Sequence, residues 1–260
     1  MDLSLTDKVA IVTGGSKGIG FQTALHLVRE GAKMTICARG QENLETAAAK
    51  IKEETGGSVI PIQADVRKAE DCQMVVEETI KQFGRLDILI NNAGTSSAKS
   101  FEEVDLDTWA EDMDLKLYGA INFSKSAVPY MKEVGKGSII NITAVIGKTP
   151  PGSSLPTSVS RAAGLGLTKA MSKDLGKYSI RVNAVCIGLI KSDQIQKRWQ
   201  RTAGHLTWEE YSKDPKHAIP LGRIGETEEA ANVITYLASD AASYVTGTAI
   251  NVDGGRGAAL

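Results

Sequence analysis

Cysteine, histidine and aromatic residues are scarce in this chain of 260 residues, and each shortage excludes a class of protein. The three cysteines are odd in number, and Cys37 and Cys186 stand inside strand-like apolar runs. Together with Cys72 they are expected to be reduced core thiols of a cytosolic protein, not a disulfide framework. The three histidines lack the spacing of metal ligands, so no metal site is expected. No apolar run approaches the roughly 20 residues of a membrane helix, which predicts no membrane partner.

An excess of charge of either sign is also missing. The chain holds 30 lysines and arginines against 31 aspartates and glutamates, so its net charge is -1. No basic surface for nucleic acid or an anionic membrane is therefore expected. The first residues lack a basic stretch followed by an apolar run, which predicts no signal peptide and a cytoplasmic location.

Short β-branched runs alternate with longer helical patterns along the whole chain. Strands are expected at 9–12, 34–38, 58–63, 86–90, 138–142 and 181–187, and helices at 21–30, 41–54, 69–83 and 108–133. This alternation predicts an α/β fold, a Rossmann-type doubly wound parallel sheet with helices on both faces. No internal repeat or linker divides the chain, so residues 1–260 are expected to form a single domain.

One stretch, residues 191–225, breaks this alternation. It contains Trp199, Trp208, Tyr211 and two prolines among mixed charges. An insertion late in a doubly wound fold is a candidate substrate lid over the carboxyl ends of the strands. The alternative is a helical pair that caps the sheet, with the aromatic residues as core anchors.

A glycine-rich loop between the first strand and the first helix carries the strongest functional signal. In Thr13-Gly14-Gly15-Ser16-Lys17-Gly18-Ile19-Gly20, Gly14 permits a tight turn, while Gly18 and Gly20 let the backbone approach a pyrophosphate. The helix that follows directs free N–H groups at the phosphates. The predicted ligand is a nicotinamide dinucleotide, with the loop residues Gly14, Ser16, Lys17, Gly18, Ile19 and Gly20 in contact with it.

The end of the second strand indicates which dinucleotide is bound. An acidic residue there would bind the ribose 2′-hydroxyl of NAD, but the strand ends Cys37-Ala38-Arg39-Gly40 without a carboxylate. Lys17 and Arg39 together form a cationic pocket suited to a 2′-phosphate. The predicted cofactor is therefore NADP(H).

With these residues in place, the chain resembles the short-chain dehydrogenase/reductase family over nearly its whole length. The matching motifs are Thr13-Gly14-x-x-x-Gly18-x-Gly20, Asp65-Val66, Asn91-Asn92-Ala93-Gly94, Arg181-Val182-Asn183-Ala184, Gly247 and Val252-Asp253-Gly254-Gly255. The resemblance implies that Asp65 and Val66 lie beside the adenine ring and that Asn92, Ala93 and Gly94 line the cofactor cleft. It also implies a small-molecule carbonyl or alcohol substrate and a homotetramer, or a homodimer, with the helices near 108–133 and 158–176 at one interface.

The same resemblance exposes four departures. The family's chemistry normally uses an Asn, a Ser, a Tyr and a Lys, and local anchors place Lys116, Ala144, Thr157 and Arg161 at these positions. None of the six tyrosines has a lysine four residues later, so the Tyr-x-x-x-Lys signature is absent from the sequence. Thr143 carries a hydroxyl beside Ala144 but is expected to face the other way along an extended segment.

The departures remove the usual proton transfer. A phenol with a pKa of about 10 can be tuned toward neutrality by a cation, whereas the hydroxyl of Thr157 cannot. Arg161 stays protonated and can bind ribose or an anion, but it cannot shuttle a proton. Lys116 is the candidate replacement acid, because burial and the like charge of Arg161 are expected to lower its pKa.

Three hypotheses account for this site. The first is an NADP(H)-dependent oxidoreductase whose catalytic residues are Lys116, Thr157 and Arg161, and its alternative is that Lys116 simply points to solvent. The second is a pseudoenzyme that binds NADP(H) without turnover. The third is a non-redox enzyme like the halohydrin dehalogenases, which resemble this family and carry an Arg where Arg161 stands. Those enzymes keep the Ser and Tyr and lose the glycines, the reverse of this chain.

Overall fold

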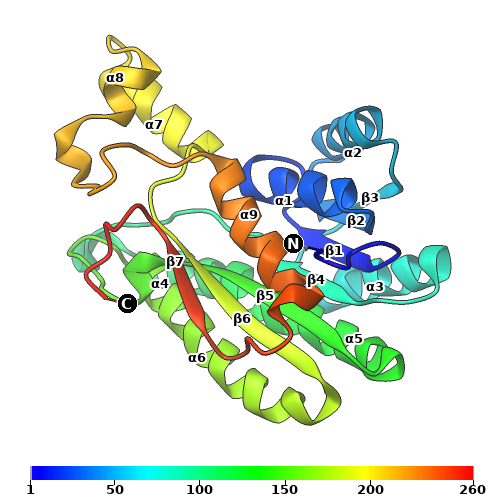
Figure 1. Ribbon diagram of the computed structural model, residues 1–260. Coiled ribbons are helices and arrows are strands. Elements are labelled where there is room, and N and C mark those ends of the chain that lie inside the picture. The colour runs from blue at the N-terminus through cyan, green and yellow to red at the C-terminus, as the bar shows by residue number, and fades with distance from the viewer. Residues whose placement is uncertain (1, 260) are drawn as a thin grey trace.

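Seven parallel strands form one sheet in the computed structural model, which describes residues 2–259 (Figure 1). The strand order is β3-β2-β1-β4-β5-β6-β7. The strands are β1 (Val9–Thr13), β2 (Lys33–Ala38), β3 (Val59–Gln63), β4 (Ile88–Asn91), β5 (Gly137–Ala144), β6 (Ile180–Ile187) and β7 (Ala249–Val252). Chain order reverses between β1 and β4, and in open α/β sheets such a reversal at the carboxyl ends of the strands is where ligands bind.

Helices cover both faces of the sheet. They are α1 (Gly18–Arg29), α2 (Gln41–Thr55), α3 (Ala69–Phe83), α4 (Leu106–Met113), α5 (Gly119–Val134), α6 (Thr157–Leu175), α7 (Asp193–Ala203), α8 (Trp208–Ser212) and α9 (Thr227–Ala238). One apolar core joins α1, α2 and α9 to the sheet, and a second joins α3, α5 and α6 to the other face. Because both faces are covered, the strands read as nearly continuous apolar runs, and the doubly wound prediction is confirmed.

The predicted helix over 108–133 is helical throughout but is not one regular helix. A π-helical turn, Asp114–Tyr118, separates α4 from α5, and the N–H of Gly119 donates to the carbonyl of Asp114 five residues earlier. π turns of this kind are rare and occur often at functional sites. Lys116 lies within this turn.

Two elements escaped the sequence prediction. Strand β7 is only four residues long and half-buried, so it lacks the strong apolar run that marks the central strands. Helix α9 follows directly on the irregular 191–225 segment, and its first turn is acidic. In the fold both elements lie at the β6 side of the sheet, where α9 packs closely against α1.

The segment 191–225 projects from the layered body as α7, α8 and a short 3₁₀ turn, Pro215–His217 (Figure 1). Its aromatic side chains pack on one another: the ring centroids of Trp199 and Trp208 are 5.6 Å apart, and those of Tyr211 and His217 are 4.8 Å apart. The aromatic residues therefore form a small core of the segment itself. Its role as a substrate lid stays a prediction.

Across residues 2–259, no helix combines the length and apolar character that spanning a bilayer requires. The same residues contain no group of three or more His, Cys, Asp or Glu side chains placed to hold a metal ion. All three cysteines are buried and free.

Candidate functional site

The glycine loop, residues 13–20, begins at the end of β1 and lies beside the end of β4. Gly14 and Gly18 have φ angles of +65° and +57°, which favour glycine because a side chain is strained there. A Cβ atom on Gly20 would stand 2.3 Å from the carbonyl oxygen of Gly14, so only glycine permits this packing. Helix α1 begins at Gly18, and no side chain caps the backbone N–H groups of its first turn. These groups are free to bind an anion.

Asn92 fixes the position of this loop. Its side-chain amide donates to the carbonyls of Thr13, at 2.9 Å, and Gly14, at 3.2 Å. The hydroxyl of Thr13 in turn accepts hydrogen bonds from the backbone N–H groups of Asn92 and Ala93, at 2.9 and 3.0 Å. Asn92 and Ala93 thereby tie the end of β4 to the end of β1, and Gly94 follows in the same loop.

Two exposed cations, Lys17 within the glycine loop and Arg39 after β2, are the residues predicted to bind a 2′-phosphate. The side chains of Lys17 and Arg39 are both exposed, and the charge of Arg39 helps to lower the pKa of Asp65. Lys17 Nζ also lies 3.9 Å from a carboxylate oxygen of Asp193, the first residue of α7. This ion pair links the projecting segment to the cofactor region. Ser16 and Ile19 are half-buried within the loop.

Asp65 and Val66, the predicted adenine neighbours, follow β3. The Asp65 carboxylate accepts hydrogen bonds from Nε of Arg67 at 3.0 Å to each oxygen, and this contact holds the pKa of Asp65 below its usual range. The carbonyl of Val66 accepts a hydrogen bond from Asn122 on α5 at 3.2 Å. Sequence reasoning did not include Arg67, although its opposite charge two residues after Asp65 was a readable signal.

Two of the three candidate catalytic residues, Lys116 and Thr157, meet between the π turn and α6, while Arg161 lies one turn further along α6. Lys116 Nζ donates a hydrogen bond to Thr157 Oγ1 at 3.1 Å and forms an ion pair with Asp112. Asp112 also accepts a hydrogen bond from Ser160 Oγ at 2.6 Å. We call Asp112, Lys116, Thr157 and Ser160 the buried polar cluster, since each is at most 8% exposed.

Burial and charge set the protonation of this cluster. Desolvation and then the nearby positive charge of Arg161 lower the pKa of Lys116 to about 8, while the carboxylate of Asp112 opposes that shift. Burial lowers the pKa of Arg161 to about 10, so its guanidinium remains charged near neutral pH. Lys116 therefore does not point to solvent, and its ammonium group can lose a proton close to physiological pH.

Arg161 reaches from α6 toward the ends of the central strands. Its Nη1 donates to the carbonyl of Ile142 on β5 at 2.6 Å, and its Nη2 lies so close to Gly94 that a Cβ there would be 2.8 Å away. Its Nε is buried and has no partner within residues 2–259. The guanidinium thus retains one buried hydrogen-bond donor without a partner among these residues.

The hydroxyl of Thr143 is turned away from this place. It lies 3.2 Å from Cys186 Sγ and 3.4 Å from the carbonyl of Val185, both on β6. The neighbouring Ala144 supplies no hydroxyl. Neither Thr143 nor Ala144 therefore offers a side-chain donor to a substrate oxygen. Among the predicted catalytic residues, Thr157 is the one that carries a hydroxyl.

Sequence reasoning missed Asp112 and Ser160. The first was readable, because Asp112 and Lys116 are four residues apart and such pairs meet on a helix surface. The second was not, since Ser160 lies 48 residues away from Asp112 and meets it only through tertiary packing.

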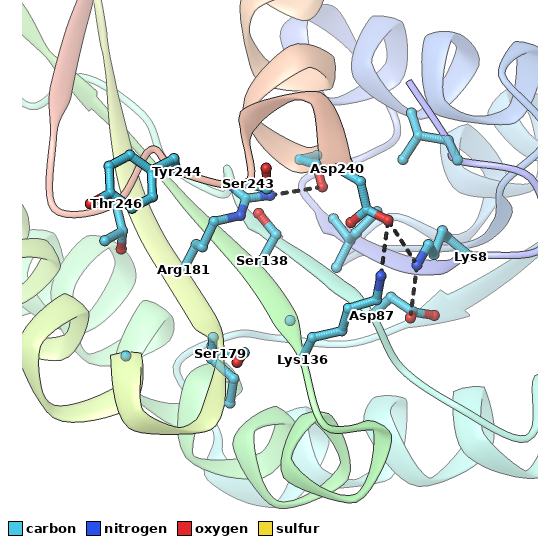
Figure 2. A pocket seen from close by; sticks show the side chains of 16 residues that line it. Lys8, Asp87, Lys136, Ser138, Ser179, Arg181, Asp240, Ser243, Tyr244 and Thr246 are labelled. Carbon is cyan, nitrogen blue, oxygen red and sulfur yellow. Dashed lines mark hydrogen bonds and ion pairs between the residues drawn. The ribbon is translucent and has the colours of Figure 1, made fainter. Parts of the chain in front are cut away.

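A cavity of about 580 Å³ lies at the opposite edge of the sheet, where β1, β4 and β5 begin (Figure 2). Asp240 lies 3.5 Å from Lys8 Nζ and 2.9 Å from Lys136 Nζ, while Asp87 lies 4.0 Å from Lys8 Nζ. A third cation of the cavity, Arg181, donates hydrogen bonds to the carbonyls of Leu237 and Ser239 at 2.7 and 2.9 Å. Because the cavity lies at the end of the strands opposite the glycine loop, it does not belong to the candidate site.

The chain is similar to known reductases and dehydrogenases over nearly its whole length. Residues 14–256 match a family described as enoyl-(acyl carrier protein) reductase. The chain is 35% identical over 255 residues to 3-oxoacyl-(acyl-carrier-protein) reductase of Thermotoga maritima, covering 97% of this chain and 99% of that protein. It is also 35% identical over 257 residues to 3alpha-hydroxysteroid dehydrogenase of Mediterraneibacter gnavus, covering 98% of each.

Solved structures agree with these sequence matches. A short-chain oxidoreductase from Pseudomonas aeruginosa, described as containing an atypical catalytic center, superposes with a TM-score of 0.95 at 31% identity. That match covers 98% of this chain and 99% of the other. L-sorbose reductase from Gluconobacter frateurii, solved with NADPH and L-sorbose, gives a TM-score of 0.94 at 32% identity, with full coverage of both chains.

Proposed function

Because the chain belongs to the short-chain dehydrogenase/reductase family, we propose that it is an NADP(H)-dependent oxidoreductase that interconverts a carbonyl and an alcohol of a small molecule. The observation that carries the proposal is the hydrogen bond from Lys116 Nζ to Thr157 Oγ1, which joins a titratable donor to a hydroxyl at the catalytic positions. Its family shows that the protein is an oxidoreductase. We propose in addition that its cofactor is NADP(H) and that Lys116, Thr157 and Arg161 are its catalytic residues.

The glycine loop supports binding of the dinucleotide. Its open backbone N–H groups at the start of α1 suit a pyrophosphate, and the missing Cβ of Gly20 keeps the loop closely packed. Lys17 and Arg39 suit a 2′-phosphate, because charge-assisted hydrogen bonds to phosphate are about twice as strong as neutral ones. The unpartnered Nε of Arg161 suits a ribose hydroxyl. The bound nicotinamide would supply or accept the hydride.

The buried polar cluster supports a proton relay. Thr157 Oγ1 accepts hydrogen bonds from Lys116 Nζ at 3.1 Å and from the backbone N–H of Ser97 at 2.9 Å. Both lone pairs are then used, and the hydroxyl hydrogen of Thr157 is left for a third partner. In the proposed step, Thr157 gives this hydrogen to the substrate oxygen while Lys116 passes its own proton to Thr157. No alkoxide forms on Thr157, and Lys116 ends as a neutral amine.

Replacing Lys116 tests the proposal. In Lys116→Met, turnover of NADPH with a reducible carbonyl is expected to fall by about 10²–10⁴-fold, the usual contribution of general acid catalysis. Binding of NADPH, followed by fluorescence titration, is expected to stay within about twofold. The matched control is Lys125→Met on the exposed face of α5, which removes the same charge from the next helix. Unchanged turnover in Lys116→Met would reject the relay.

A second candidate function is a pseudoenzyme that binds NADP(H) without turnover. The observation that favours it is closure: the side chains of Lys116 and Asp112 are each 1% exposed, and Ser97 covers Thr157. A substrate would reach Thr157 only after the loop that follows β4 moved. Tight NADPH binding with no NADPH consumption across a broad panel of aldehydes and ketones would support this alternative over the oxidoreductase.

A further inference from the structure

Asp112 is buried against the proposed proton donor, and nothing about the glycine loop or the cofactor requires it there. Building on the proposed function, we propose that Asp112 is a positioning residue that keeps Lys116 protonated and directs its ammonium group at the Thr157 hydroxyl. Asp112 itself would touch neither substrate nor cofactor.

The geometry supports this role because each oxygen of the Asp112 carboxylate has its own partner. Oδ1 pairs with Lys116 Nζ from the π turn, and Oδ2 accepts the hydrogen bond from Ser160 Oγ on α6. Two fixed partners on different elements hold the carboxylate in one orientation. Lys116 is therefore held between Asp112 on one side and Thr157 on the other.

The charges that face Lys116 oppose each other. Asp112 on α4 favours the ammonium form, whereas burial and Arg161 on α6 favour the neutral amine. The remaining contacts of the cluster, the hydroxyls of Thr157 and Ser160, carry no charge. Asp112 is thus the group that balances desolvation and Arg161, so removing it should lower the pKa of Lys116.

A purely structural role explains the pair less well. Buried ion pairs are often no more stabilising than apolar side chains of similar volume, because desolvation offsets their attraction. The arrangement instead suits proton transfer: an acid works best when its pKa lies near the operating pH, and the balance of burial, Arg161 and Asp112 brings Lys116 to about 8.

The first experiment reads the ionisation of Lys116 directly. Lysine labelled with ¹³C at Cε is followed by NMR from pH 6 to 10 in the full-length protein, with Lys116→Met identifying the signal. In Asp112→Asn the midpoint of the Lys116 titration is expected about one pH unit lower than in the parent. Asp105→Asn, at the exposed start of the same helix, makes the same charge change and should leave the midpoint in place. An unmoved midpoint in Asp112→Asn overturns the proposal.

The second experiment reads turnover. Carbonyl reduction needs the protonated Lys116, so removal of Asp112 should act mainly at high pH. For Asp112→Asn, kcat for reduction is expected within about threefold of the parent at pH 6 and about tenfold lower at pH 8.5. A uniform fall at all pH values would indicate a structural role and overturn the proposal. If the NMR midpoint moves while the parent consumes no NADPH, the proposed function fails and the effect of Asp112 on Lys116 stands.

A double variant covers the case in which Asp112→Asn does not fold because Lys116 is left unpaired. Asp112→Asn combined with Lys116→Met removes both buried charges together. If Asp112 acts through Lys116, the double variant should show the same residual turnover and pH profile as Lys116→Met alone. A further loss of more than about threefold would show that Asp112 acts independently of Lys116 and would overturn the proposal.

Discussion

The glycine loop and the buried polar cluster belong to one fold, yet they achieve their chemistry in different ways. The glycine loop uses backbone: N–H groups at the start of α1, positive φ angles and a missing Cβ at Gly20. The cluster uses side chains contributed by α4, the π turn and α6. A backbone site accepts few substitutions, because its shape is the chain itself. A side-chain site can be rebuilt, provided that every buried group finds a partner.

The cluster meets that condition. Lys116 has Asp112 and Thr157 as partners, and Asp112 has Ser160 as its second partner. Buried polar groups without partners are costly, so a lysine placed here alone would have destabilised the fold. The difference between the two regions teaches that the cofactor pattern constrains function less than the identity of the side chains beside it.

The largest loss of NADPH binding at the glycine loop is expected from a substitution of Gly20. In Gly20→Ala the new Cβ would lie 2.3 Å from the Gly14 carbonyl and 2.5 Å from the Asn92 amide nitrogen, so the loop must shift. Overpacking of this kind typically costs about 1–3 kcal/mol, and if the strain falls on the binding-competent loop, NADPH should bind about 10–100-fold more weakly. Fluorescence titration measures the affinity and thermal unfolding measures the stability.

Gly166→Ala on α6 is the matched control. Within residues 2–259, no atom other than the neighbouring backbone of α6 lies within 4 Å of the added Cβ, and alanine is the better helix former. NADPH affinity should be unchanged in this variant. Equal affinities in Gly20→Ala and Gly166→Ala would show that the glycine loop does not depend on close packing.

A smaller effect is expected at the two exposed cations. Lys17→Met and Arg39→Met should each weaken NADPH binding by about tenfold, because each removes a charge-assisted contact to the 2′-phosphate. NADH lacks this phosphate, so its affinity should change by less than about twofold. Lys52→Met removes an exposed charge from the last turn of α2 and serves as control. Equal weakening of NADH and NADPH would contradict the assignment.

The smallest effect is expected where the projecting segment meets the glycine loop. Lys17 and Asp193 form a pair at 3.9 Å, with both side chains about half exposed, and such pairs contribute at most about 1 kcal/mol. Asp193→Asn frees Lys17, so NADPH affinity should rise by about twofold at low ionic strength and by less in high salt. Weaker binding in Asp193→Asn would mean that the ion pair orders the site instead of competing with the cofactor.

The sequence was sufficient for the parts of the molecule that local pattern dictates. The central strands and the helices of both faces follow from their apolar periodicity, and the glycine loop follows from its position between strand and helix. Strand β7 was missed because its four half-buried residues give no such pattern. Of the site, Lys116 and Thr157 were brought together by resemblance to the family, not by any local signal.

The rest of the site depends on tertiary packing. Ser160 can be linked to Asp112 only when α4 and α6 are known to lie side by side. The aromatic residues of 191–225 pack on one another, and no spacing in the sequence distinguishes that arrangement from a substrate pocket. The sequence thus predicted which segments are helices and strands better than it predicted where their side chains point.

Because of the π turn, the buried polar cluster depends on the number of residues between α4 and α5 as well as on the identity of its four side chains. An α-helix rotates by about 100° for each residue, and the wide turn at Asp114–Tyr118 holds one residue more than a regular turn would need. Deletion of a single residue there would rotate α4 against α5 and carry Asp112 away from Ser160. A relative could therefore keep all four side chains and still lack the cluster. In this protein the cluster therefore requires the extra residue of the π turn, which sets the rotation of α4 relative to α5, as well as the four side chains.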